Sequence, residues 1–212
     1  LAYNEIGSIP DDSYSKLQSL EFLDLSSNNF EVLVEDTFQP LPSLKTLSLH
    51  NNGVENVNMF AFRSLDQLES IDLSHNKIVF LDAVTFKSNK RIKTIDLSHN
   101  HIHYINGVFE NLEELGELFL PENNILEVPK DAFTGSAALT VIYLQQNAIR
   151  RIDEEAFVTQ KLLTQLYLSE NFIERVPKYL LQENTLLISL SLDDNWIAGL
   201  EPGTFSRVKE LK

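Results

Sequence analysis

Apolar residues return at fixed intervals along nearly the whole chain, in the order Leu-x-x-Leu-x-Leu-x-x-Asn-x-Ile or a close variant of it. The first full copy runs from Leu20 to Phe30, and further copies begin at residues 44, 68, 92, 115, 139, 163 and 187. Successive copies start 24 residues apart, except for one step of 23 between residues 92 and 115. A period of this length indicates stacked units, each of which buries its apolar side against its neighbours.

The alternation within each copy predicts a short strand, with two leucines pointing inward and the residues between them pointing outward. Stacked copies would then form a parallel sheet on one wall and place a phenylalanine-bearing segment on the other. We predict a single array over residues 1–212, with a partial repeat over residues 1–19 and the start of another at 211. The phenylalanines of the second wall are Phe38, Phe62, Phe86, Phe109, Phe133, Phe157 and Phe205, of which Phe109 comes one residue early.

The pattern resembles the leucine-rich repeat of the 24-residue typical type, as in Toll-like, chaoptin-like and glycoprotein-hormone receptor ectodomains. This resemblance implies an α/β solenoid: a horseshoe with a parallel β-sheet on its concave face and irregular or short helical turns on its convex face. It also implies an extracellular or cell-surface setting. Both ends of the sequence fall inside a repeat without a polar cap, so we expect a segment of a longer secreted or membrane-anchored protein.

One asparagine recurs in each copy at a position that the alternation turns inward. An unpaired buried amide costs about 1–3 kcal/mol, so these side chains must be hydrogen-bonded. Asparagine offers both a donor and an acceptor and can satisfy the turn backbone of its own and the neighbouring copy. We predict a structural ladder of Asn4, Asn28, Asn52, Asn76, Asn100, Asn123, Asn147, Asn171 and Asn195.

The outward strand residues form what we call the concave wall, and aromatic side chains gather on part of it. Phe119, Tyr143 and Tyr167 share the middle outward position of three successive copies, with Val141 beside them. Exposed aromatic clusters with polar rims are typical of protein-binding hot spots, although aromatic residues also pack across strands simply to cover a sheet. We predict that a protein with a basic face binds here, at Phe119, Val141, Tyr143, Tyr167, Glu117 and Asp193, with Glu122 and Glu170 at the rim.

All five histidines lie between residues 50 and 103, on the first half of the array. His75 and His99 occupy aligned positions beside Asp72 and Asp96, where like charges on neighbouring strands are unfavourable unless they are neutralised. A pH-sensitive contact or an adventitious metal site is one interpretation, because histidine titrates near neutral pH and binds metals. Solvated side chains without a binding role are the alternative, and the one that we favour.

A second aromatic pair stands just after the ladder asparagines, where Phe172 and Trp196 occupy matching positions in consecutive copies. They should lie on one flank of the array, near Arg150, Arg151 and Arg175. Two interpretations stay open: a lateral interface, through which the protein forms a homodimer or another assembly, and local packing of the last copies.

Composition narrows the function classes further. The chain has 31 acidic and 17 basic residues, a net charge of -14, and no cysteine. An acidic surface disfavours nucleic acid and anionic lipid as partners, and no apolar stretch reaches the roughly 18 residues of a membrane helix. Because no catalytic or ligand-spaced motif interrupts the repeats, we expect no enzyme, no cofactor and no bound metal. The function we favour is a receptor module that binds a protein ligand or co-receptor, ahead of a flank-mediated adhesion module and an intracellular scaffold.

Overall fold

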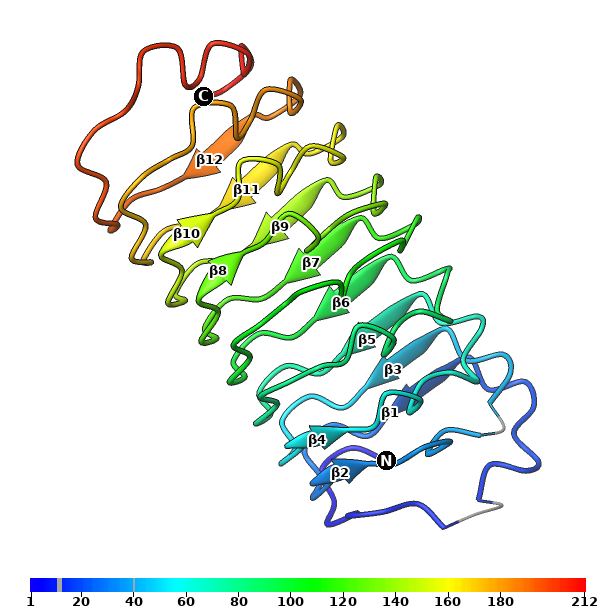
Figure 1. The fold of residues 1–212 in the computed structure, drawn as a ribbon. Helices are drawn as coiled ribbons and strands as arrows, with labels where there is room; N and C mark the ends of the chain where they lie inside the picture. Colours follow the sequence, from blue (N-terminus) through cyan, green and yellow to red (C-terminus); the bar gives the residue numbers. More distant parts are fainter. Residues whose placement is uncertain (11–12, 40) are drawn as a thin grey trace.

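The computed structural model describes residues 1–10, 13–39 and 41–212 and shows a solenoid of parallel strands, with the N- and C-termini at opposite ends of the stack (Figure 1). Its main element is an eight-stranded parallel sheet in which each strand comes from one repeat. The strands, in spatial order, are β1 (Phe22–Asp24), β3 (Thr46–Ser48), β5 (Ser70–Asp72), β6 (Thr94–Asp96), β7 (Glu117–Phe119), β9 (Val141–Tyr143), β11 (Gln165–Tyr167) and β12 (Ser189–Ser191).

The register of this sheet pairs residues at the same position of successive repeats. Leu166 on β11, for example, lies opposite Ile142 on β9 and Leu190 on β12. The central residue of each strand from β1 to β11 points inward and is buried, whereas most of the flanking residues are partly exposed. The predicted alternation and its direction are therefore confirmed.

Two small parallel sheets follow the asparagine turns on the other side of the array. One joins β2 (Val32–Leu33) to β4 (Asn56–Val57), and the other joins β8 (Glu127–Val128) to β10 (Arg151–Ile152). Each strand has only two residues, too few to leave an alternating pattern in the sequence.

The convex face is built on a column of buried phenylalanine rings. From Phe38 to Phe157, successive rings stack with centroids 5.7–6.5 Å apart. The strands of a sheet are about 4.8 Å apart. Successive repeats are therefore farther apart at their phenylalanine rings than at their strands. This difference in spacing makes the stack curve, with the sheet on its concave face.

The short helical turns expected on the convex face are not found, because residues 1–10, 13–39 and 41–212 contain no helix. The convex segments instead use single turns, in which an N–H donates to the carbonyl three residues earlier. Examples are Ala61 N to Asn58 O, 2.9 Å, and Thr85 N to Asp82 O, 3.0 Å. A helix needs several consecutive turns to repay its nucleation, and these segments return to the next strand first. The described part of the chain thus includes no helix able to cross a bilayer.

The ladder asparagines connect each repeat to the one before it. Asn100 Oδ1 accepts from Ile78 N at 2.9 Å, and its Nδ2 donates to Leu73 O of the preceding repeat at 2.9 Å and to Leu97 O of its own at 3.1 Å. The same bonds recur at Asn28, Asn52, Asn76, Asn123, Asn147, Asn171 and Asn195. Asn4 is exposed and makes only the bonds within its own repeat, from Nδ2 to Leu1 O and Ala2 O.

The residue before each ladder asparagine has a left-handed backbone, a conformation that is uncommon outside glycine. The φ angles lie between 51° and 58° at Tyr3, Ser27, Asn51, His75, His99, Glu122, Gln146, Glu170 and Asp194. The ladder bonds hold this turn in place and so fix the direction of the side chain at its corner.

A second set of buried polar side chains lies on the convex side and was not predicted. Gln160 Nε2 donates to Phe133 O at 2.7 Å and to Ser136 O at 3.2 Å. Asn89 and Asn184 make the equivalent pair of bonds, and Ser136 donates to Phe109 O. The position is leucine or valine in the other repeats, so its polar members are not recognisable as a ladder from the sequence.

Replacing Asn100 by alanine would leave Ile78 N and several carbonyl groups without their side-chain partner in a buried turn. We expect Asn100→Ala to lower the free energy of unfolding by about 2 kcal/mol or more, measured by urea denaturation, and to leave ligand binding intact. Asn124→Ala is the matched control, because Asn124 is the exposed neighbour of a ladder residue. Unchanged stability together with lost binding would contradict the structural assignment.

Candidate functional site

The aromatic side chains predicted for the concave wall form one continuous stack. The ring centroids of Phe119 and Tyr143 are 4.7 Å apart with an interplanar angle of 11°, and those of Tyr143 and Tyr167 are 4.8 Å apart with an angle of 2°. The register of β7, β9 and β11 places the three residues directly opposite one another. The stack therefore presents a line of ring edges, rather than open ring faces, to the space in front of the sheet.

The neighbours of this stack are unequally exposed. Glu117 is exposed, but Val141, expected to point outward with it, is only 8% exposed between Glu117 and Gln165. Tyr167 Oη donates to Gln165 Oε1 at 2.7 Å, which fixes the last ring of the stack. Burial against the other rings raises the pKa of Tyr143, and the nearby Tyr167 and Glu117 act in the same direction, so its hydroxyl stays a hydrogen-bond donor at neutral pH.

Carboxylates border the stack along the turn that follows the strands. Glu170 accepts from Gln146 Nε2 at 3.0 Å, and Glu122 pairs with His99 Nδ1 at 2.9 Å. Asp193 is exposed at the end of the rim, beside Asp194. The rim thus combines acidic groups that are partly held by neighbours with others that remain open to solvent.

On the first half of the wall, Asp72 and Asp96 lie opposite each other, as the register requires. Each accepts hydrogen bonds from the backbone N and the hydroxyl of the serine two residues later, Ser74 or Ser98. The same arrangement at Asp24 with Ser26 lowers the pKa of Asp24. These local bonds give the Oδ1 atoms of Asp72 and Asp96 hydrogen-bond partners, so no external cation is required to explain the pair.

Three histidines form a contiguous row along the rim. The rings of His75 and His99 stack at 3.9 Å with an interplanar angle of 17°, and His50 meets His75 edge-on at 5.0 Å. His50 Nδ1 lies 2.8 Å from Ser74 Oγ. Within residues 1–10, 13–39 and 41–212, no group of three or more histidine, aspartate or glutamate side chains is arranged to hold a metal ion.

The flank aromatics Phe172 and Trp196 contact each other, with centroids 4.8 Å apart and rings inclined at 54°. Trp196 is 54% exposed, and the guanidinium of Arg150 lies 5.9 Å from the Phe172 ring centroid. Arg151 and Arg175, which were predicted to lie near this pair, form ion pairs with acidic residues. Their guanidinium groups pair with Glu127 at 2.7 Å and with Glu201 at 2.6 Å.

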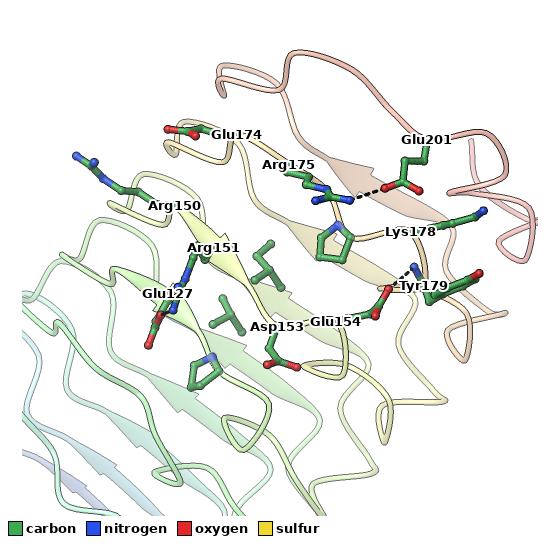
Figure 2. Close-up of a pocket in the computed structure, with 14 residues that line it drawn as sticks. Glu127, Arg150, Arg151, Asp153, Glu154, Glu174, Arg175, Lys178, Tyr179 and Glu201 are labelled. Carbon is green, nitrogen blue, oxygen red and sulfur yellow. Dashed lines mark hydrogen bonds and ion pairs between the residues drawn. The ribbon is translucent and has the colours of Figure 1, made fainter.

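Arg151 and Arg175 line a shallow cleft of about 960 Å³ formed by residues of four successive repeats (Figure 2). Its charged walls include Asp153, Glu154 and Lys178, and Arg175 points at Glu201 across one side. These ion pairs are exposed, and such pairs add little stability. This cleft was not predicted from the sequence, because its lining residues are spread over four repeats and share no repeated residue type.

Exposed apolar residues on the flank of the middle repeats were also not predicted from the sequence. Val79 and Phe80 are 48% and 59% exposed, and Tyr104, aligned with Phe80 in the next repeat, is 53% exposed. Aligning the repeats would have revealed Phe80 and Tyr104, since the same position carries Glu127, Arg151 and Arg175 in the next three repeats.

The histidine row predicts a measurable titration. Partial burial, then the neighbouring His99 and His50, lower the pKa of His75 below 6.5, against the opposing effect of Asp96 and Glu122. Because the folded pKa lies below the unfolded one, the folded state gains stability from neutral His75 above pH 6.5 and loses this gain as the pH falls. NMR titration should show this depressed pKa and its rise in His99→Asn. His101→Asn, a change outside the stack, should leave it in place, and an equal rise in both variants would contradict the stacking argument.

Comparisons with known proteins agree with this geometry. The family described as leucine rich repeat matches residues 1–54, 42–102, 66–125 and 113–173. No curated protein matches the sequence. The Toll–Spatzle complex from Drosophila contains a chain that is 27% identical with a TM-score of 0.91, over 100% of this chain and 28% of that one.

Two further solved structures show the same fold at lower identity. The TLR13–ssRNA13 complex is 22% identical with a TM-score of 0.78, over 98% of this chain and 41% of that one. The LRIM1/APL1C complex is 22% identical with a TM-score of 0.79, over 94% of this chain and 35% of that one. The expectation that nucleic acid is excluded as a partner is not borne out, because one of these structures with this fold binds RNA. The acidic net charge on which it rested describes the whole chain and not a particular surface.

This chain therefore spans less than half the length of each of these proteins. The repeat period, the parallel sheet and the family match over most of the sequence have one explanation. The chain belongs to the leucine-rich-repeat family.

Proposed function

We propose that this chain is a non-catalytic, protein-binding part of an extracellular or cell-surface receptor ectodomain, and that its ligand docks on the concave wall. The observation that carries the proposal is the stack of Phe119, Tyr143 and Tyr167 at outward strand positions. Inward leucines already fill the core, so the core does not require aromatic residues on the opposite side of the strands.

Such a stack suits a macromolecular partner for an energetic reason. The rings are held by one another and by the Gln165 contact, so binding costs little of their conformational freedom. Partly buried aromatic residues at the centre of an interface provide most of the affinity in many protein complexes. Glu117, Glu170 and Asp193 add an acidic border, which favours a partner with lysine or arginine around an apolar centre.

The similar structures support binding as the general role. Toll is solved with Spatzle, and LRIM1 is solved with APL1C. The Toll–Spatzle complex, which has the higher sequence identity of the two, favours a protein ligand for this chain.

Tyr143 lies in the middle of the stack, so its removal should have a larger effect than removal of a peripheral residue. We expect Tyr143→Ala to weaken ligand binding by about 2 kcal/mol, roughly thirty-fold in Kd, with folding intact. The measurement is surface plasmon resonance against a panel of purified secreted proteins that includes Spatzle. Tyr104→Ala on the flank is the matched control. Equal losses in both variants, or none in Tyr143→Ala, would refute the concave-wall site.

A second candidate function, self-association through the flank, is favoured by the exposure of Trp196 and its contact with Phe172. A large exposed indole beside another ring is unusual on a monomer surface and typical of interfaces. Arg150 lies close enough to add a cation–π contact to the pair.

Light scattering over a range of concentrations tests this candidate. Self-association predicts that the apparent mass of the wild type rises with concentration, whereas Phe172→Ser combined with Trp196→Ser stays monomeric because the apolar contact is gone. Phe119→Ser combined with Tyr143→Ser should associate like the wild type. A wild type that stays monomeric throughout would eliminate flank-mediated homodimers.

A further inference from the structure

The one-residue deletion in the repeat that begins at Ile92 changes the local chemistry of a single asparagine. At the turn that leads to the convex face, three other repeats carry an aspartate or asparagine whose Oδ1 accepts from the backbone N two residues later. These bonds are Asn58 to Phe60 N, Asp82 to Val84 N and Asp153 to Glu155 N, at 2.9, 3.0 and 2.9 Å. Each side chain is thereby held against its own turn.

Asn106 occupies this position in the shortened repeat, but its side chain has lost that bond. The turn starts one residue earlier, and Val108 N donates to Ile105 O at 3.4 Å instead of to the Asn106 side chain. Asn106 is exposed, and its carboxamide has no hydrogen-bond partner among the residues that the structure describes. The next residue, Gly107, has φ of +67°, and its N–H donates to no backbone carbonyl in the described residues.

The sequence contains a second Asn-Gly pair, Asn52 and Gly53, and this pair is hydrogen-bonded. Asn52 Oδ1 accepts from Phe30 N at 3.1 Å, and its Nδ2 donates to Leu25 O and Leu49 O at 3.0 and 3.1 Å. Gly53 N donates to Phe30 O at 2.9 Å. One Asn-Gly pair is thus fully bonded into the ladder, whereas the side chain and the glycine N–H of the other have no hydrogen-bond partner in the described part of the chain.

We propose that Asn106 is a site of spontaneous modification, at which the folded protein converts asparagine to aspartate and isoaspartate. Glycine lacks a side chain that would shield its nitrogen, so Gly107 N can attack Cγ of Asn106. The new N–Cγ bond forms as the Cγ–Nδ2 bond breaks, and ammonia leaves with the proton from Gly107 N. Water then opens the five-membered imide at Cγ to give aspartate, or at the backbone carbonyl carbon to give isoaspartate. No oxidant or reductant takes part.

The modification adds a carboxylate on a turn two residues from the exposed Tyr104 and aligned with Asp82 of the preceding repeat. The isoaspartate product also lengthens the backbone by one atom in the repeat that is one residue short. The site lies away from the concave wall, so this inference is independent of the proposed ligand binding.

The test is prolonged incubation of the folded protein at mildly alkaline pH, followed by proteolysis and mass spectrometry of the peptides that contain the two Asn-Gly pairs. We expect conversion at Asn106 to grow with time and Asn52 to stay intact, with an acidic species appearing in ion-exchange chromatography. In guanidinium, where both pairs are unfolded, the two should convert at similar rates. Conversion at equal rates in the folded protein, or none at Asn106, would overturn the proposal.

A length-restored variant tests the structural cause. An alanine inserted after Gly107 gives this repeat the length of its neighbours and keeps the Asn-Gly pair, so the side chain should recover its turn bond and conversion at Asn106 should slow. Asn106→Ser should abolish the acidic species altogether. Unchanged kinetics in the insertion variant would show that the deletion is not the cause, and an acidic species that persists in Asn106→Ser would place the modification elsewhere.

Discussion

The structure depends on the hydrogen bonding of one buried amide per repeat. Each ladder asparagine from Asn28 to Asn195 accepts from a backbone N of the preceding repeat and donates to carbonyls of both repeats. These contacts connect neighbouring repeats at the point where the chain leaves the sheet, and they hold the left-handed residue before each asparagine. A leucine could fill the same space, but it would leave the turn backbone without partners in a buried place. Stability is therefore shared between apolar stacking and a polar connection that also fixes the register.

The curvature of the array follows from the different spacing of successive repeats on its two faces. Strand-side aromatic rings are spaced at 4.7 and 4.8 Å, and convex phenylalanine rings at 5.7–6.5 Å. The curvature exposes the outward strand positions on a broad wall on which side chains can change without cost to the core. The side chain at the position before each ladder asparagine can also change without cost to the core. The left-handed backbone there is fixed, and it brings His75 and His99 into contact.

Much of this could be predicted from the sequence, because strands, ladder and phenylalanine column are each repeated with the same residue type. Features that depend on the difference between repeats were harder to foresee. Val141 shares its column with Glu117 but is buried, because the lengths of its neighbours decide its exposure. The flank arginines pair with glutamates one repeat away, a choice that a single repeat does not encode. The two-residue strands are too short to have a periodic signal, and the absence of helices in the described residues reflects turn lengths that the resemblance alone did not specify.

The buried polar residues of the convex side have a consequence for how such an array can evolve. Asn89, Gln160 and Asn184 all donate to backbone carbonyls at equivalent positions of the preceding repeat, beginning with that of its phenylalanine. Every repeat has those backbone carbonyls, whatever its side chains are. A buried polar side chain at this position can therefore donate to the preceding repeat regardless of that repeat's sequence. Gene duplications or losses of whole repeats would then leave no buried donor stranded, and arrays could change in length by recombination while their wall residues diverge. Even the 23-residue repeat keeps this arrangement, because its Phe109 O accepts from Ser136 Oγ of the next repeat.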